Sequence, residues 1–478
     1  MTVPELLDRY LSGALTVEAA ARARAERIER EDRGEGGLRS LLRPNPRLAE
    51  DARALDALLG SLPAPRRPED LPALLGVPVA VKDNIDTVDL GCTAGSVLLE
   101  GVPVESDAPV VTRLRSAGAL IVGKANLSEW ANYRSTRSTS GWSSAGGQTL
   151  NPVDRTRTPC GSSSGSASAV RAGLALCAVG TETDGSILCP AATQGLVGFR
   201  PAVGTVPGEG IVPISPSQDT AGPIALTVED AFRLQEVLEG RTDAASGVRP
   251  RPERIPAGEL RLGVFDPGKD IHPRVAALWL RARERLAGAG FRLVDLPPLA
   301  DPDRIEAAEE TILDYEFPRA LARYLAERRP RSPFRTLEDL RRANLERADA
   351  VLGPFGQEIW DRILSPAAPS EEAYLRAKAE VDDRARRRGI DPWFEDPGID
   401  AAICPANGPA WVIDPVNGDR YTGTPTPPGA AAGYPGITVP MGTVSGLPIG
   451  LYLLARPGGE ARLWSAAAAA ERALAAAT

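Results

Sequence analysis

Short apolar runs and amphipathic stretches alternate along much of the chain, and this alternation predicts the fold class. Apolar runs of strand length occupy residues 74–81, 119–122, 260–265 and 291–296. Between the members of each pair, residues 108–117 and 273–287 carry apolar positions at helical spacing. Two strand–helix–strand units follow from this order. They favour an α/β fold in which helices flank a mixed, mostly parallel central sheet.

The remaining segments are expected to surround that sheet. Residues 4–31 read as two short helices separated at Gly13, with Thr16 as an N-cap, and residues 48–59 as a third helix. A helix over 228–239 begins after Thr227 with a pattern like a capping box. Helices dominate from 305 to 387, strands return at 401–404, 437–442 and 447–454, and an alanine-rich helix ends the chain. No internal repeat is evident.

Changes in composition divide the chain into four expected parts. Residues 1–60 form an N-terminal helical arm, and residues 61–240 form the core. A β-α-β unit with a helical insertion occupies 241–395, and residues 396–478 return to the core sheet. A chain of 478 residues with 43% hydrophobic content can bury an extensive core, and the length fits either one large α/β domain or two smaller ones.

Charge and cysteine content restrict the class of protein. A net charge of −8 argues against a nucleic-acid surface, and no apolar run is long enough to suggest a membrane span or a secretory leader. We therefore expect a cytoplasmic protein without nucleic-acid or membrane partners. The five cysteines are odd in number and lack C-x-x-C spacing, which predicts reduced thiols and no structural zinc. Cys160 and Cys189 are interpreted as small buried hydrophobic residues.

The stretch from Thr158 to Pro190 is the strongest candidate for a functional site. It places Gly- and Ser-rich turns at both ends of an apolar, alanine-rich segment. Such composition is common in flexible linkers, but a linker would not be enclosed by apolar segments on both sides. Backbone N–H groups and serines at the two ends can converge on one point.

Two familiar serine-nucleophile arrangements fit this stretch poorly. Residues 161–165 match the G-x-S-x-G elbow around Ser163, but the segment before them is a poor strand. The one histidine, His272, lies in an expected exposed turn. The S-x-x-K motif of penicillin-binding proteins is absent, since no serine has a lysine three residues later.

Lysine usage suggests a different general base. Only four of the 55 basic residues are lysines: Lys82, Lys124, Lys269 and Lys378. An arginine cannot lose its proton in a protein, whereas a buried lysine can. Lys82 follows a buried strand, where desolvation lowers the pKa of an ammonium group. The alternative is an ion pair of Lys82 with Asp83 or Asp86.

Three motifs together resemble the amidase signature family. They are Gly-Val-Pro-Val-Ala-Val-Lys-Asp-Asn-Ile at 76–85, Pro-Cys-Gly-Ser-Ser-Ser-Gly-Ser at 159–166, and Gly-Thr-Glu-Thr-Asp-Gly-Ser-Ile-Leu-Cys-Pro at 180–190. Their order and spacing match, and the similarity reaches residues 406–410 and 433–442. Residues 126–133, 140–152 and 212–223 are most similar to the peptide amidase-like subgroup.

The resemblance implies a Ser-Ser-Lys triad that needs no metal or cofactor. Ser186 would be the nucleophile, Ser162 the bridging serine after a cis peptide bond, and Lys82 the base. Backbone N–H groups of Thr183, Asp184, Gly185 and Ser186 would form the oxyanion hole. Much of the family has glycine at the position of Asp184, so this residue is interpreted as a subgroup feature.

The expected activity is that of a serine amidase that releases ammonia from the C-terminal amide of peptides. Tyr133 and Trp142 are candidates for the substrate pocket. Two alternatives within the family remain open: a broad aliphatic or aryl amidase, and the A-type glutaminase component of glutamyl-tRNA amidotransferase. A third is an inactive, amidase-like binding protein. The sequence leaves the oligomeric state undetermined.

Overall fold

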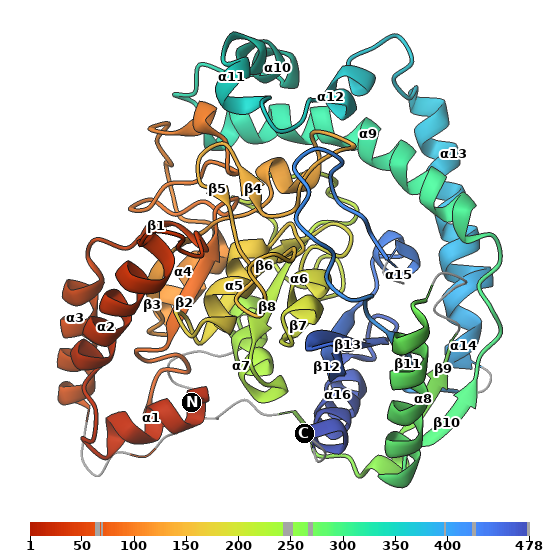
Figure 1. Ribbon diagram of the computed structural model, residues 1–478, viewed down its shortest axis with the longest axis horizontal. Helices are drawn as coiled ribbons and strands as arrows, with labels where there is room; N and C mark the ends of the chain where they lie inside the picture. Colours follow the sequence, from red (N-terminus) through yellow and green to blue (C-terminus); the bar gives the residue numbers. More distant parts are fainter. Residues whose placement is uncertain are drawn as a thin grey trace.

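A large mixed β-sheet runs through the centre of the computed structural model (Figure 1). The structure describes all residues except 63–66, 68–69, 242–251, 266–270, 396–397, 423–426 and 476–478. Within the described residues the sheet has 11 strands in the order β1-β3-β2-β6-β8-β7-β12-β13-β11-β9-β10. The expected α/β fold with a central mixed sheet is confirmed.

The strands of this sheet follow the apolar runs closely. They are β1 (Leu41–Pro44), β2 (Pro78–Lys82), β3 (Leu120–Ala125), β6 (Cys177–Glu182), β7 (Val197–Arg200), β8 (Thr220–Ala225), β9 (Arg261–Val264), β10 (Arg292–Asp295), β11 (Ala401–Pro405), β12 (Gly436–Val444) and β13 (Leu447–Leu454). Every residue of β2, β3, β6 and β13 is buried, as expected for strands covered on both faces.

Parallel pairing is confined to the two wings of the sheet. Strands β3, β2 and β6 are parallel on one side, and β11, β9 and β10 on the other. From β6 through β8, β7, β12 and β13 to β11, every pair is antiparallel. The strand–helix–strand rhythm predicted the wings. In the centre, β8 lies between β6 and β7 and is antiparallel to both, and β12 and β13 form a hairpin.

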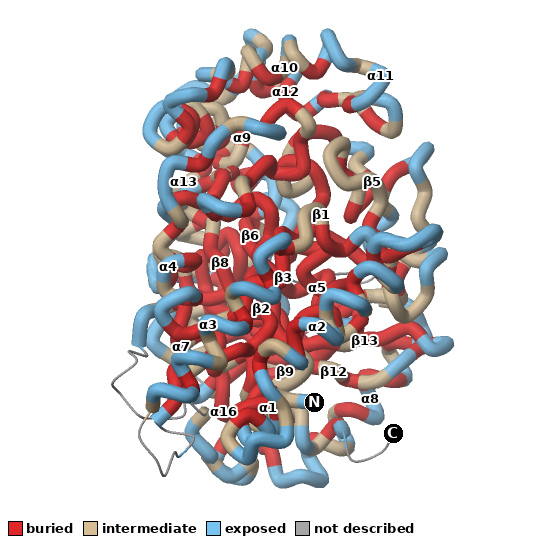
Figure 2. The backbone as a smooth tube through the Cα atoms, turned by 90° about the vertical axis from the view of Figure 1, so that its left-hand side faces the viewer, coloured by how far each residue is buried: buried red, intermediate tan, exposed pale blue. Residues whose placement is uncertain are grey.

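Helices cover both faces of the sheet. One layer contains α5 (Ser164–Arg171) and α6 (Leu188–Thr193), and the other contains α4 (Pro109–Ser116), α7 (Val228–Glu239), α8 (Pro273–Gly288) and α16 (Glu460–Ala475). Thr227 caps α7 through its side chain, as the sequence predicted. Figure 2 shows that the buried part of the chain runs through the middle of the molecule and the exposed part around it.

The N-terminal arm packs beside β3. It contains α1 (Val3–Leu11), α2 (Val17–Arg27), the π-helix η1 (Ile28–Arg33) and α3 (Leu48–Ser61). Thr16 accepts a hydrogen bond from the backbone N–H of Ala19, so the predicted N-cap of α2 is confirmed. Helices α2 and α3 lie against each other at the left of Figure 1.

A long arch of helices, drawn in green to blue, passes over the upper edge of the sheet in Figure 1. It begins with α9 (Pro302–Arg328), which contacts α13 along much of its length. Its other members are α10 (Leu337–Glu346), α11 (Ala348–Val351), α12 (Glu358–Ile363), α13 (Glu371–Val381), η6 (Asp382–Ile390) and α14 (Asp391–Glu395), with α15 (Pro427–Ala431) packed against α9. The predicted run of helices is confirmed.

Short elements complete the fold. They are the 3₁₀ helices η3 (Val97–Leu99), η4 (Glu129–Asn132) and η5 (Ala257–Glu259), and the strands β4 (Trp142–Ser143) and β5 (Gly147–Gln148). The two strands form an antiparallel hairpin between η4 and α5. No helix of the described residues is long and apolar enough to cross a membrane.

Candidate active site

Lys82 is the last residue of β2 and is fully buried. Strand β2 lies parallel to β6, with Val81 opposite Val179, so the lysine side chain reaches the end of β6 at Thr181. Its Nζ lies 2.7 Å from Ser162 Oγ, 2.9 Å from Thr181 Oγ1 and 3.2 Å from the Thr181 carbonyl oxygen. The register of two parallel strands therefore places an amine beside the bridging serine.

The surroundings of Lys82 favour a neutral amine. Burial lowers the pKa of Lys82 to about 7, and the negative charges of Glu182 and Asp219 partly oppose that shift. A neutral amine has two N–H donors and one lone pair. Since the carbonyl oxygen of Thr181 can only accept, donation to the two Thr181 oxygens leaves the lone pair facing Ser162. Lys82 can then accept the Ser162 proton.

The ion-pair alternative for Lys82 is not what the structure contains. Asp83 pairs with Arg43 at 2.9 Å and lies 3.6 Å from Lys124, while Asp86 pairs with Arg328 and Arg329. Among the described residues, no carboxylate oxygen lies within 4 Å of Lys82 Nζ. Lys82 and Lys124 are both buried, but only Lys124 has a carboxylate oxygen within 4 Å among the described residues.

Lys124 has a carboxylate neighbour, which Lys82 lacks in the described part of the chain. Burial lowers the pKa of Lys124, and the charge of Asp83, which lies 3.6 Å from its Nζ, opposes that shift. Its Nζ donates to the carbonyl oxygens of Gly91, at 2.7 Å, and Ile85. It also contacts Thr87 Oγ1 at 3.2 Å. Two carbonyl acceptors and a nearby carboxylate favour an ammonium group, which indicates a structural role.

Ser162 occupies a tight turn before α5. The Gly161–Ser162 peptide bond is cis, as the resemblance implied, and Ser162 is fully buried. A Cβ atom at position 161 would lie 2.3 Å from Ser128 Oγ, so only glycine fits there. The backbone N–H of Ser128 donates to the Ser162 carbonyl at 3.1 Å, which secures the turn from the other side.

Ser186 lies in the connection from β6 to α6, where Gly185 has a φ of 73°. One oxygen of Glu182 accepts the N–H groups of Ile187, at 2.6 Å, and Leu188, at 2.9 Å, and so holds the start of α6. The N–H of Ser163 donates to the Ser186 carbonyl at 3.1 Å, which joins the two serine segments. Ser186 is 8% exposed, whereas Ser162 and Lys82 are 0% exposed. Of the three residues, Ser186 is therefore the only one that is slightly exposed.

The backbone of residues 183–186, hereafter the oxyanion loop, contains N–H groups that can bind a ligand. Within the described residues, the N–H groups of Thr183, Gly185 and Ser186 have no hydrogen-bond acceptor. The Thr183 hydroxyl donates to Asp219 Oδ1 at 2.5 Å. Free N–H groups beside a serine at a helix start can stabilise an oxyanion.

The elbow arrangement around Ser163 is not formed. The Ser163 hydroxyl donates to the Thr181 carbonyl at 3.1 Å and accepts from the Thr181 N–H at 3.3 Å. His272 is exposed at the start of α8, where its Nδ1 accepts the N–H of Arg274. Ser163 thus serves to join the α5 segment to β6.

Tyr133 and Trp142 pack beneath the helical arch. The Tyr133 hydroxyl donates to Asp314 at 2.7 Å, and its ring meets Phe317 edge-on. The Trp142 ring meets Phe355 edge-on. Neither residue lines the cavity described next, and their role in a pocket stays a prediction.

A cavity of about 640 Å³ opens between residues 203–220 and α9. Its lining includes Thr181, which hydrogen-bonds Lys82, and the polar residues Asn84, Thr183 and Asp219. Asn84 Nδ2 donates to Thr181 Oγ1 at 2.9 Å. Sequence reasoning missed Asn84, Thr181 and Asp219 as site components, although each lies in a quoted motif, and it named Thr183 only for its backbone N–H group. The other lining residues are mostly apolar, with charged residues of α9: Val203, Val206, Ile211, Val212, Ile214, Arg323, Glu327 and Arg328.

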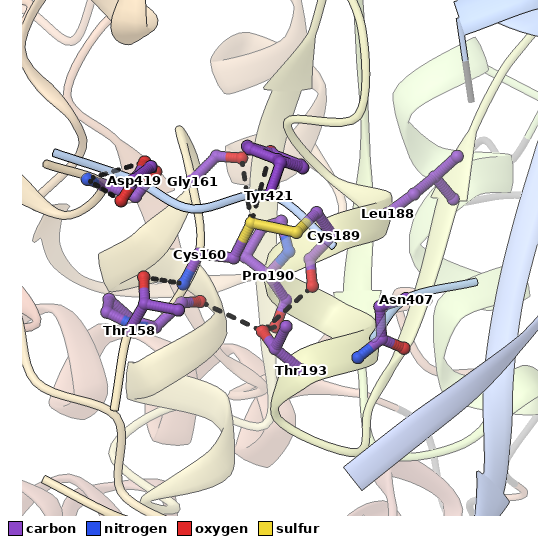
Figure 3. Close-up of a disulfide and its surroundings, with 12 residues drawn as sticks. Thr158, Cys160, Gly161, Leu188, Cys189, Pro190, Thr193, Asn407, Asp419 and Tyr421 are labelled. Carbon is purple, nitrogen blue, oxygen red and sulfur yellow. Dashed lines mark hydrogen bonds between the residues drawn. A yellow bond between two sulfur atoms is a disulfide. The ribbon is translucent and has the colours of Figure 1, made fainter. Parts of the chain in front are cut away.

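The prediction of reduced thiols is wrong for two of the five cysteines. Cys160 and Cys189 form a disulfide, shown in Figure 3, while Cys92, Cys177 and Cys404 are free and buried. The bridge joins the segment before Ser162 to α6, which follows Ser186. Their distance of 29 residues along the chain hid a proximity that only the fold creates. Because disulfides favour oxidising surroundings, the expected cytoplasmic location stays a prediction.

Comparison with known proteins identifies the family. The Amidase family model matches residues 49–464. The chain belongs to the amidase family. It is therefore a hydrolase of amide C–N bonds, and the amidase fold expected from the motifs is confirmed.

Several amidases of known structure or function are similar over nearly the whole chain. Native peptide amidase from Stenotrophomonas maltophilia is 38% identical, with a TM-score of 0.89 over 99% of this chain and 97% of that one. A structure of the peptide amidase PAM with the competitive inhibitor chymostatin is 39% identical, with the same TM-score and coverage. The A-type component of glutamyl-tRNA(Gln) amidotransferase from Symbiobacterium thermophilum is 36% identical over 94% of this chain and 91% of its own length.

Proposed function

We propose that this amidase hydrolyses the C-terminal amide of peptides through a Ser186–Ser162–Lys82 triad. The observation that carries the mechanism is the 2.7 Å contact between Lys82 Nζ and Ser162 Oγ, in a place where no described carboxylate pairs with the lysine. The similarity to peptide amidase over 99% of the chain supports the substrate class.

Acylation begins with two proton transfers. Neutral Lys82 accepts the proton of the Ser162 hydroxyl, and Ser162 accepts the proton of Ser186. The Ser186 oxygen bonds to the amide carbon, and the carbonyl electron pair moves to the oxygen. N–H groups of the oxyanion loop then hold the negative oxygen, and one such donor typically contributes about 3 to 4 kcal/mol.

Collapse of this intermediate releases the first product. The carbonyl re-forms, the C–N bond breaks, and the nitrogen takes the proton returned from Lys82 through Ser162, so that ammonia leaves. Water then attacks the acyl-enzyme, its proton passes along the same relay, and the released Ser186 oxygen recovers a proton. The second product is the free acid.

The decisive experiment measures ammonia release from four compounds: a peptide amide, the free-acid form of the same peptide, glutamine and a simple aliphatic amide. We expect the wild-type protein to consume the peptide amide alone and Ser186→Ala to consume none. Turnover of glutamine would instead favour the glutaminase activity of glutamyl-tRNA amidotransferase. Turnover of the aliphatic amide would favour a broad amidase.

A second experiment tests the nucleophile independently of the substrate. A serine-directed covalent probe, followed by peptide mapping, is expected to label Ser186. Label on Ser163 would restore the elbow arrangement, and absence of label in the wild-type protein would favour an inactive binding protein. Chymostatin is expected to slow labelling, by analogy with its competitive inhibition of peptide amidase.

A further inference from the structure

Asp219 stands directly opposite the oxyanion loop. It precedes β8, whose antiparallel pairing with β6 places Thr220 opposite Glu182. One residue further on each strand, Asp219 therefore faces Thr183, the first residue of the oxyanion loop. Strand pairing, rather than nearness along the chain, creates this contact.

The carboxylate of Asp219 joins two loops. Its Oδ1 accepts the Thr183 hydroxyl at 2.5 Å. Its Oδ2 accepts the backbone N–H groups of Ile214, at 2.8 Å, and Ser215, at 2.9 Å. Both oxygens are thus occupied, one by the oxyanion loop and the other by the segment that walls the cavity.

The wall segment is itself fixed from the other side. The Ser215 hydroxyl donates to Glu316 of α9 at 2.7 Å, and the same carboxylate oxygen accepts the Ser217 N–H at 3.1 Å. Asp219 therefore connects the oxyanion loop to an anchored structure. If that connection loosened, Thr183 and the donors after it would lose their fixed position.

Charge gives Asp219 a second influence on the site. Its negative charge raises the pKa of Lys82, in the same direction as that of Glu182 and against the larger effect of burial. Arg200 of β7 acts in turn on Asp219, lowering a pKa that burial raises to about 6. On the cavity side, Arg323, Glu327 and Arg328 of α9 are the charged residues that share the lining with Asp219, together with Glu209.

We propose that Asp219 is a positioning residue for amide hydrolysis, which fixes the oxyanion loop through its hydrogen bond with Thr183. This inference rests on the proposed function in taking residues 183–186 as the oxyanion hole and Lys82 as the base. Asp219 acts through Thr183 and Lys82, and no contact with substrate is assigned to it.

The test compares Asp219→Asn, Thr183→Val and Thr183→Ser with the wild type on the amide that the wild type consumes best. We expect Asp219→Asn and Thr183→Val each to lower kcat about 10- to 100-fold, since a displaced oxyanion donor has effects of this order. KM should change less than about threefold, because the ground-state amide gains little from the oxyanion hole. Thr183→Ser keeps the hydroxyl and should retain nearly full kcat.

The pH profile separates positioning from a general loss of structure. Removing the Asp219 charge lowers the pKa of Lys82, so the acid limb of the kcat/KM profile should move to lower pH in Asp219→Asn. Thr183→Val keeps the Asp219 charge, so the acid limb of the kcat/KM profile should stay at the same pH. A structural defect alone would not move the two variants differently.

Asp32 supplies a matched control. It too accepts a serine hydroxyl and two backbone N–H groups, from Ser40 at 2.5 and 2.7 Å and from Leu41 at 3.0 Å, but in the N-terminal arm. Asp32→Asn should lower the Tm without moving kcat or the acid limb.

The outcomes distinguish the two proposals. A wild type that consumes no amide, or a Ser186→Ala variant that does, contradicts the proposed function. A wild type that needs Ser186, combined with an Asp219→Asn variant of unchanged kcat and acid limb, overturns the role of Asp219 alone. Equal losses in Thr183→Ser and Thr183→Val would also overturn it.

Discussion

Lys82 Nζ lies 2.7 Å from Ser162 Oγ, although 80 positions separate the two residues along the chain. The contact exists because β2 and β6 are parallel neighbours and α5 begins beside their carboxyl ends. An ammonium here would lack a carboxylate partner, whereas a neutral amine is hydrogen-bonded on every side. Burial lowers the pKa of Lys82 to about 7, so the amine can lose its proton near neutral pH.

Replacing Lys82 by arginine should abolish turnover. A guanidinium cannot give up its proton, and general-base catalysis contributes about 10²- to 10⁴-fold. The measurement is kcat for ammonia release with Lys82→Arg. The matched control is Lys378→Arg in α13, which we expect to be fully active. An active Lys82→Arg enzyme would contradict the relay.

Activity should rise with pH through about 7, because Lys82 must lose its proton and burial lowers its pKa to about 7. A profile of kcat/KM between pH 5 and 10 checks this expectation. A profile that stays flat from pH 5 to 8 would show that the titrating group is not the base.

The lowered pKa of Lys82 also makes the free energy of unfolding depend on pH. Between about pH 7 and the ordinary lysine value near 10.4, the unfolded chain binds more protons than the folded one, so stability rises with pH in this window. Lys82→Met should be inactive, yet its free energy of unfolding at pH 7 should be higher by about 1 to 3 kcal/mol. Its stability should no longer rise with pH in this window. Denaturant unfolding at pH 7 and 10 measures both. A less stable Lys82→Met variant would mean that Lys82 is charged in the folded protein and that its surroundings stabilise the charge.

Gly161 should not tolerate even a methyl group. Its Cβ would lie 2.3 Å from Ser128 Oγ, inside the turn that presents Ser162. Gly161→Ala is expected to lower kcat by about tenfold or more, because a small displacement of Ser162 breaks the relay. Gly288→Ala, whose Cβ would meet nothing within 4 Å, is the matched control. Full activity in Gly161→Ala would require a turn different from the one described.

The disulfide gives a simple count of thiols. Denatured but unreduced protein should expose three titratable thiols, and reduced protein five. The bridge closes a loop of 29 residues, so Cys160→Ser with Cys189→Ser should cost about 3 to 4 kcal/mol of stability. Five thiols without reductant would restore the original expectation of reduced cysteines.

The sequence predicted what depends on local pattern. Motifs located Lys82 and Ser162, capping signals located the starts of α2 and α7, and apolar runs located the strands. Lysine scarcity drew attention to Lys82 and Lys124 alike, and only the surrounding acceptors distinguish a base from a structural cation.

What the sequence could not show depends on strands and loops meeting in space. Asp219 faces Thr183 only because β8 runs antiparallel to β6. The strand–helix–strand pattern of the sequence does not predict this pairing. The disulfide could not be predicted from cysteine spacing, because Cys160 and Cys189 are 29 residues apart along the chain. One lies in a turn and the other in α6. The antiparallel pairing in the centre of the sheet was likewise not predicted, because it too depends on which strands meet in space.

The inward order of burial, from the slightly exposed Ser186 to the enclosed Ser162 and Lys82, closes the relay to bulk solvent. Each proton that reaches Lys82 comes from Ser186 or from the attacking water, and each one leaves by the same route. One full cycle therefore neither takes up nor releases a proton through the lysine. Buffer ions should have no part in turnover, and a small amine added to a Lys82→Ala enzyme would have to pass through the surrounding protein to reach the cavity left by the lysine.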